Sequence, residues 1–153
     1  MNIVIFLDSG PLGLVTNPNK ANADAKACAE WLISRLNAGA RVCVPEICDY
    51  EVRRELVRAN KTNGLARLDQ LKQKIEYVPI TTPMMLKAAE FWAAARNSHQ
   101  PTAPREALDG DVILAAQAAL SAQIGEEVVI ATTNVGHLAM FASAKRWNEI
   151  TGA

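Results

Sequence analysis

The sequence predicts an α/β protein with three layers, α/β/α, in which helices cover both faces of a central, mostly parallel sheet. Short apolar runs of strand length alternate along the chain with longer segments of helical periodicity, and this alternation is typical of a parallel sheet. The first run, Ile3 to Leu7, has no polar residue, as expected of a strand buried on both faces. No repeat or low-complexity tract interrupts the pattern, so one domain over residues 1–153 is expected.

The composition excludes several classes of protein. Half of the 153 residues are hydrophobic, which is typical of a globular chain and not of a disordered one. The 16 basic and 16 acidic residues balance, so contact with nucleic acid would need a local basic patch. No segment reaches the length of a membrane span, and the first apolar run is too short for a signal peptide. The three cysteines lack C-x-x-C spacing and are expected to be reduced thiols in a cytoplasmic protein.

The expected elements follow from apolar runs and from the residues between them. Strands are expected at residues 3–7, 41–44, 77–80 and 128–131, with a last edge strand near 147–150. Helices are expected at residues 24–37, 46–59, 65–75, 82–96 and 109–122, with a short one near 136–144. Prolines and polar residues predict loops at 12–23 and 97–106.

Turn and capping residues set the boundaries of these elements. Asp24 is expected to cap or charge the start of the first long helix, and Gly39 to stop it. Pro45 ends the second strand, and Asn63-Gly64 marks a turn before the third helix. Thr82-Pro83 is typical of a cap followed by a first helical turn.

The carboxyl end of the first strand carries the first candidate for chemistry. Asp8 follows the buried run directly, and Ser9 and Gly10 come next. In open α/β sheets, ligands lie just beyond the carboxyl ends of the strands. Asp8 is therefore expected to face a binding site, and other acids that reach the same edge would complete it.

Glu51 is the second candidate, in the second turn of the predicted helix over 46–59. It shares a helix face with Ile47, four residues earlier. The simpler interpretation is a surface carboxylate paired with Arg54, worth only a few tenths of a kcal/mol. Spacing alone does not decide between the two.

Asp111 is the third candidate, close to the start of the predicted helix over 109–122. Asp109 as an N-cap and Asp111 in the first turn would explain both acids without any function. The residues that follow are small and apolar, which favours close packing of this helix on the sheet. Such packing would hold Asp111 rigidly near the edge where Asp8 is expected.

Thr132, Thr133 and Asn134 follow the fourth strand directly, so they belong to the same edge. They are also common turn formers. In a functional site their hydroxyl and amide groups would orient a carboxylate, a water or a phosphate.

The three candidate carboxylates would repel one another if they lay together at this edge, and the repulsion would raise their pKa values. A divalent cation bound between them would offset that repulsion. An all-oxygen site suits Mg²⁺ or Mn²⁺, which points to metal-dependent phosphodiester hydrolysis.

Four segments in order resemble the PIN domain family, in particular the VapC-type toxin ribonucleases. They are I-V-I-F-L-D-S-G from residue 3, V-P-E-I-C-D-Y-E-V-R-R-E-L from 44, D-V-I-L-A-A-Q-A-A-L from 111, and I-A-T-T-N from 130. The resemblance spans nearly the whole chain. It implies a compact α/β/α fold and cleavage of RNA that depends on Mg²⁺ or Mn²⁺. It also implies a cognate antitoxin and a homodimer.

Carried over by motif, the resemblance makes Asp8, Glu51 and Asp111 the catalytic, metal-binding acids. Asp8 and Asp111 are the expected direct ligands, Glu51 binds directly or through water, and Ser9 and Thr132 support them. The family often has a fourth acid after the last parallel strand. Asn134 and His137 stand there instead, which weakens the expectation of a second metal.

Arg54 and Arg58 lie in a basic stripe that also includes Arg53 and Lys61. This stripe would contact phosphates or, equally, form a solvated face balanced by Glu46, Asp49 and Glu55.

The alternative to a ribonuclease is a non-catalytic PIN module that binds RNA or a protein partner. A phosphatase with Asp8 as nucleophile ranks lower, because Gly10 stands where such enzymes need a second aspartate.

Overall fold

The structure is a computed structural model, and it describes residues 2–98 and 105–152. Within these residues, one sheet contains the strands β1 (Asn2–Leu7), β2 (Arg41–Pro45), β3 (Glu76–Val78), β4 (Glu126–Thr132) and β5 (Ala144–Arg146). The α-helices are α1 (Ser9–Val15), α2 (Ala23–Asn37), α3 (Glu46–Arg58), α4 (Thr62–Lys74), α5 (Thr82–Arg96) and α6 (Arg105–Ser121). Two short 3₁₀ helices are η1 (Gly136–Met140) and η2 (Trp147–Glu149). None of the described helices is both long and apolar enough to cross a bilayer.

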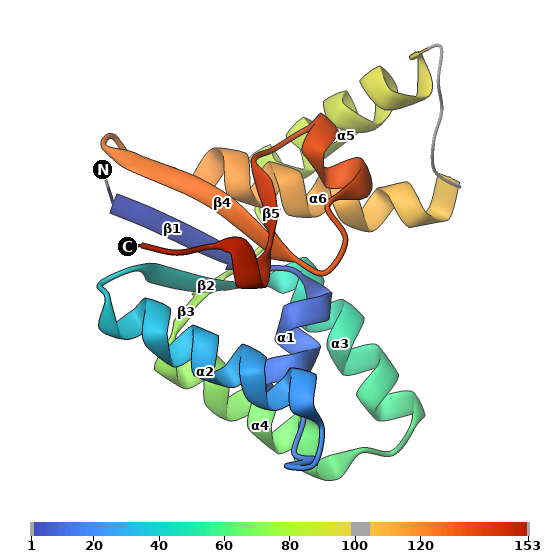
Figure 1. Cartoon of the computed structure of the whole chain (residues 1–153). Coiled ribbons are helices and arrows are strands. Elements are labelled where there is room, and N and C mark those ends of the chain that lie inside the picture. The colour runs from blue at the N-terminus through green and yellow to red at the C-terminus, as the bar shows by residue number, and fades with distance from the viewer. Residues whose placement is uncertain (1, 99–104, 153) are drawn as a thin grey trace.

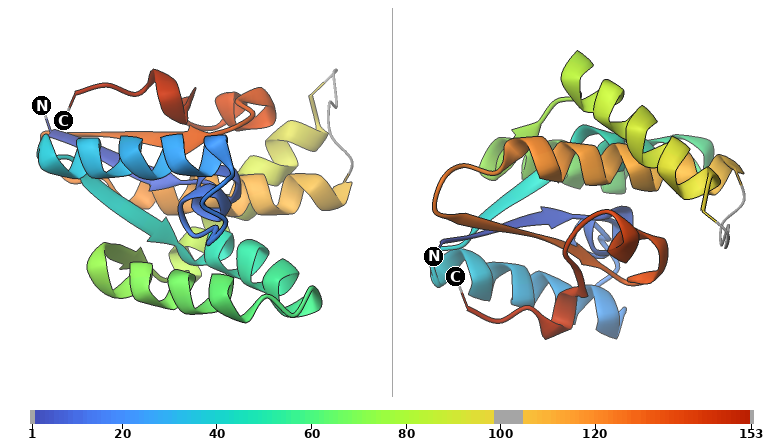
Figure 2. Two further views of the ribbon diagram at one scale, coloured as in Figure 1. Left: turned by 60° about the horizontal axis from the view of Figure 1, so that its bottom comes forward. Right: turned by 90° about the horizontal axis from the view of Figure 1, so that it is seen from above.

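The sheet has the strand order β3-β2-β1-β4-β5, and each neighbouring pair is parallel (Figure 1). Helix α2 covers one face, and α6 with α5 beside it covers the other (Figure 2). The predicted three-layer α/β/α fold is therefore confirmed. Val4 to Leu7 of the central strand are completely buried, as their unbroken apolar run predicted.

Helix α1 corrects the expectation of a loop over residues 12–23. Asp8 caps it, because one carboxylate oxygen accepts a hydrogen bond from the Ser9 amide and the Asp8 carbonyl accepts one from the Leu12 amide. Pro11 predicted a break, but it lies in the first turn, where its missing N–H is not needed. The chain therefore turns into a helix immediately after Asp8.

Other helix starts also differ from the prediction. Asn22 caps α2, while Asp24 adds its charge in the first turn, the second of the two roles expected for it. Thr81, not Thr82, caps α5. Asn63-Gly64 lies inside the first turn of α4 instead of forming a turn before it. Of the predicted loop over 97–106, residues 99–104 lie outside the described part of the chain, whereas Arg105 already belongs to α6. Asp109 is therefore inside a helix and is not its cap.

The last strand is β5, and the predicted strand near residues 147–150 is wrong. Trp147 stacks edge-on against Trp31 of α2 with ring centroids 5.8 Å apart, and the Trp31 indole N–H donates to the Ile150 carbonyl. Ile150 is buried. The apolar residues of this segment thus pack on α2 while the more polar residues before them pair with β4.

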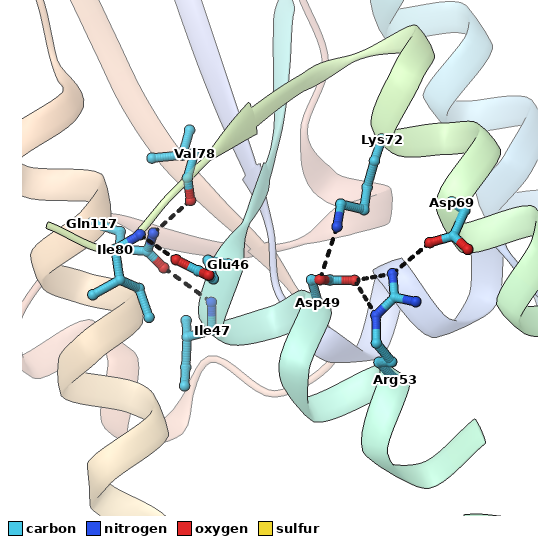
Figure 3. Close-up of polar contacts among 9 residues, drawn as sticks. All are labelled: Glu46, Ile47, Asp49, Arg53, Asp69, Lys72, Val78, Ile80 and Gln117. Atoms are coloured by element: carbon cyan, nitrogen blue, oxygen red, sulfur yellow. Dashed lines mark hydrogen bonds and ion pairs between the residues drawn. The ribbon is translucent and has the colours of Figure 1, made fainter. Parts of the chain in front are cut away.

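Gln117 of α6 joins three elements inside the core (Figure 3). Its side chain is completely buried, and its amide nitrogen donates to the Val78 carbonyl at 2.8 Å. Its amide oxygen accepts from the Ile47 backbone N–H, 3.3 Å away in the first turn of α3. Pro45 precedes that turn and offers no side-chain cap, so Gln117 supplies the cap from another helix.

Charged side chains also connect α3 to its neighbours (Figure 3). Asp49 is buried, and its two oxygens form ion pairs with Arg53 at 2.9 Å and Lys72 of α4 at 3.1 Å. Glu46 accepts a hydrogen bond from the Ile80 amide at 2.6 Å. These two acids therefore do not belong to a solvated face, and only Glu55 pairs with an exposed arginine, Arg58.

We predict that Gln117→Leu lowers the free energy of unfolding by about 2–6 kcal/mol. The leucine leaves the Ile47 N–H and the Val78 carbonyl buried without partners, at about 1–3 kcal/mol for each such group. Chemical denaturation measures the change. Gln73→Leu, on the exposed face of α4, is the matched control and is expected to change stability by at most about 0.5 kcal/mol. Equal effects of the two substitutions would contradict this role for Gln117.

Candidate metal-binding site

Asp8 is held in place at the carboxyl end of β1. One carboxylate oxygen accepts from the Ser9 amide at 2.8 Å, and the other accepts from the Thr132 hydroxyl at 2.8 Å. Thr132, at the end of β4, is itself buried. Because β1 and β4 are paired neighbours, the two ends of these strands fix one carboxylate between them. The sequence predicted the positions of Asp8, Ser9 and Thr132 at this edge, and the structure brings them into contact.

Cys48 lies against the same carboxylate and was not predicted to be near it. Its thiol is 3.8 Å from an Asp8 oxygen, and ligand atoms of Asp8, Cys48 and Glu51 all lie within 4.8 Å of one another. Burial, and then the charges of Asp8 and Glu51, raise the pKa of the Cys48 thiol well above its usual value. The sequence did contain a signal, because Cys48 and Glu51 are three residues apart on one helix.

Glu51 points from α3 toward α6 and not into solvent. It is half-buried, and its Oε2 lies so close to Gly110 that a β-carbon there would be 2.7 Å away. Burial raises the pKa of Glu51, the charges of Asp8 and Asp111 raise it further, and Arg54 opposes them. No ion pair joins Glu51 to Arg54 in the described residues, and the Arg54 guanidinium lies over the Tyr50 ring instead. The interpretation of Glu51 as a paired surface carboxylate is therefore wrong.

Asp111 faces the same edge from the second turn of α6. Burial, and then the negative charge of Asp8, raise its pKa from 3.8 to about 6, while His137 opposes the shift. Asp111 is not part of the group of Asp8, Cys48 and Glu51 whose ligand atoms lie within 4.8 Å of one another. It does not lie in a first helical turn as predicted, because α6 begins at Arg105.

The residues after β4 form a compact turn. The Asn134 amide N–H donates to the Thr132 hydroxyl oxygen at 3.1 Å, and the Asn134 side-chain oxygen lies beside Gly136. Asn134 thus supports Thr132 through its backbone, and its exposed side chain turns toward Gly136. His137 follows in η1 and acts on Asp111 through its charge.

The arginines of α3 have separate surroundings. Arg53 is engaged by Asp49 and Asp69, whereas Arg54 and Arg58 are both exposed. Arg58 pairs with Glu55 at 2.9 Å. Arg54 is the basic side chain whose charge acts on Glu51.

The donor set fits a divalent cation. Two carboxylates and a thiol lie within reach of one ion, and a third carboxylate stands beside them. In the described residues, no lysine or arginine forms an ion pair with Asp8, Glu51 or Asp111. Burial raises the pKa values of Glu51 and Asp111, and the negative charge of Asp8 raises them further. A bound cation would offset these negative charges, and carboxylate oxygens are the usual ligands of Mg²⁺ and Mn²⁺.

No protein-family model matches the chain, and no curated protein sequence matches it either. Solved structures do share its fold. A chain of VapBC2 from Rickettsia felis, bound to a promoter DNA fragment, has a TM-score of 0.67 and 12% identity, covering 94% of this chain and 98% of that one. A chain of VapBC-1 from nontypeable Haemophilus influenzae has a TM-score of 0.67 and 13% identity, with coverages of 95% and 99%.

A third match is to a chain of FitAB bound to the IR36 DNA fragment. Its TM-score is 0.66 at 17% identity, and the alignment covers 96% of this chain and 97% of that one. The likeness therefore extends over almost the full length of each protein. This chain therefore shares the three-layer, PIN-like fold of these VapBC and FitAB chains, as its motifs predicted.

We predict that Asp111→Asn stabilises the metal-free protein at neutral pH by about 1–2 kcal/mol. A carboxyl whose pKa rises from 3.8 to about 6 on folding destabilises the folded state once the pH exceeds its unfolded-state value. The contribution of Asp111 to the free energy of unfolding therefore falls between about pH 4 and pH 6 and stays lower above that range. Asparagine does not ionise, so Asp111→Asn should not show this fall in the free energy of unfolding.

The measurement is chemical denaturation at a series of pH values in EDTA. Asp109→Asn is the control, because Asp109 lies on the same helix with an exposed side chain. An unchanged pH dependence in Asp111→Asn would contradict the crowding of charge at this site.

Proposed function

We propose that this protein is a metal-dependent ribonuclease that hydrolyses RNA phosphodiester bonds with Mg²⁺ or Mn²⁺. The proposal rests on three carboxylates that lie near one another at one edge of a VapC-like sheet. They belong to Asp8, Glu51 and Asp111, which come from three separate parts of the chain. Burial, and then the charge of Asp8, raise the pKa values of Glu51 and Asp111, and no lysine or arginine of the described residues forms an ion pair with the three acids. Such an arrangement destabilises the protein unless a cation binds there.

In this proposal Asp8 and Asp111 hold the metal directly, and Glu51 holds it directly or through a water. Thr132 and the Ser9 amide keep the Asp8 carboxylate in a fixed orientation, and Asn134 supports Thr132. The ion, when bound, supplies an acidified water and offsets negative charge on the phosphoryl group. Exposed Arg54 and Arg58 are the proposed contacts for neighbouring phosphates, since α3 places them beside Glu51.

We further propose that the protein is the toxin of a toxin–antitoxin pair. Solved structures that share its fold include VapBC and FitAB complexes, which supports an antitoxin partner here. A homodimer, a single domain over residues 1–153 and a cytoplasmic location complete this proposal.

The alternative is a PIN module that binds RNA or a protein without cleaving it. Asn134 and His137 after β4 favour this alternative, because neither is a carboxylate. Asn134 is exposed with its side chain toward Gly136, so it is a weak candidate for a metal ligand. The carboxylates of Asp8, Glu51 and Asp111 are all present, which favours catalysis.

We predict that the purified protein cleaves members of a mixed RNA panel in Mn²⁺ or Mg²⁺ but not in EDTA. Asp8→Asn should lower the cleavage rate at least about 100-fold, because it removes the charge of a ligand and leaves one acceptor oxygen where two accept from Ser9 and Thr132. Asp24→Asn, on the exposed side of α2, is the control and should cleave like the wild type.

Gel electrophoresis of end-labelled RNA measures these rates. Cleavage by Asp8→Asn at the wild-type rate would refute the assigned site. A folded wild-type protein that binds RNA but does not cleave it at any metal concentration would favour the non-catalytic module.

A further inference from the structure

Gly110 lies between Asp109 and Asp111 in the interior of α6, where a glycine needs an explanation. Glycine is less favourable than alanine inside a helix. Its backbone does not require glycine, because its φ is not among the positive values found at other glycines of the chain. The reason must therefore be the space that a side chain would occupy.

That space is filled by the carboxylate of Glu51. A β-carbon at Gly110 would lie 2.7 Å from Glu51 Oε2, 3.4 Å from Cδ and 3.7 Å from Oε1. A separation of 2.7 Å is well inside van der Waals contact. The three nearest atoms all belong to one side chain, so this glycine accommodates the Glu51 carboxylate and nothing else at that distance.

We propose that Gly110 is a positioning residue, whose missing side chain lets the Glu51 carboxylate lie against α6 between Asp8 and Asp111. The inference rests on the proposed metal-dependent function. It goes further by naming the contact that keeps the second acid in the site. Without that contact Glu51, on a flexible side chain at an exposed end of the sheet, has other rotamers directed away from α6.

A methyl group at this position would act on Glu51 in particular. Leu114, Ala115 and Ala116 are buried where α6 packs on the sheet. This packing holds the α6 backbone in place, so α6 should not move away from the added methyl group. The carboxylate is the mobile partner and would rotate away. Asp8, held by Ser9 and Thr132, has no contact with Gly110 and would keep its place.

Gly13 is a matched control inside the same chain. It also lies within a helix, α1, and a β-carbon there would meet no atom within 4 Å. Gly13→Ala should therefore show the ordinary gain from alanine in a helix. For a chain of this size that gain corresponds to a rise in Tm of about 2–4 °C.

The first test is a metal-free thermal unfolding cycle of wild type, Gly110→Ala, Glu51→Ala and the double variant. Gly110→Ala alone should raise Tm by less than Gly13→Ala does, or lower it, because the methyl group displaces Glu51. In the Glu51→Ala background the clash is gone, and Gly110→Ala should raise Tm by the full amount of about 2–4 °C. Equal shifts in both backgrounds would overturn the steric claim.

The second test is Mn²⁺ binding, measured by calorimetry on the same folded variants. Gly110→Ala should bind Mn²⁺ at least about tenfold more weakly than wild type, while Gly13→Ala should bind like wild type. Wild-type affinity in Gly110→Ala would overturn the positioning role. A wild-type protein that binds no Mn²⁺ would instead contradict the proposed function, and the metal-free cycle would still decide the contact between Gly110 and Glu51.

Discussion

The hydrogen bonds of the Gln117 amide set the geometry on which the candidate site depends. Glu51 and Asp111 lie on two helices, α3 and α6, that are far apart in the sequence. Gln117 is on α6, six residues after Asp111, and it caps the first turn of α3, four residues before Glu51. Its other bond, to Val78, ties the same pair to the end of β3. Because both bonds are buried, neither helix can slide without leaving a polar group unpaired.

Acidic residues have different surroundings at the two edges of the sheet. At the amino edge, Arg41 forms ion pairs with Glu76 and with Glu126, so both acids have a basic partner. At the carboxyl edge, no lysine or arginine of the described residues forms an ion pair with Asp8, Glu51 or Asp111, and burial and then the charge of Asp8 raise the pKa values of Glu51 and Asp111. An acid cluster that serves stability alone would be arranged like the amino edge. The carboxyl edge is arranged like a site that a cation completes.

Much of this arrangement could be predicted from the sequence. The apolar run of β1 and the small residues after Asp111 are local patterns, and they correctly predicted a buried central strand and a closely packed helix. Asp8 was predicted at the site because strand ends in parallel sheets are a general location for ligands. The α1 helix was missed because its start depends on a cap by Asp8 that outweighs the break expected at Pro11. The β5 strand was misplaced because Trp147 and Ile150 pack on α2, a contact that no local pattern shows.

Two residues of the site owe their place in it to contacts between elements that are far apart in the sequence. Cys48 is an ordinary buried thiol in the sequence, and only the approach of β1 to α3 places it against Asp8. In the sequence, Gly110 is a single residue that destabilises its helix. Only the structure shows the Glu51 carboxylate beside it. Both depend on the distance between elements that are separated by dozens of residues. Tertiary geometry, and not the identity of single residues, therefore defines this site.

The most direct test of a metal centre is a crystal of the wild-type protein grown or soaked with Mn²⁺, examined by anomalous scattering. We predict an anomalous peak bounded by the carboxylates of Asp8, Glu51 and Asp111, with oxygen ligands from Asp8 and Asp111. A well-ordered carboxyl edge without such a peak at millimolar Mn²⁺, or a peak only at another place on the surface, would contradict it.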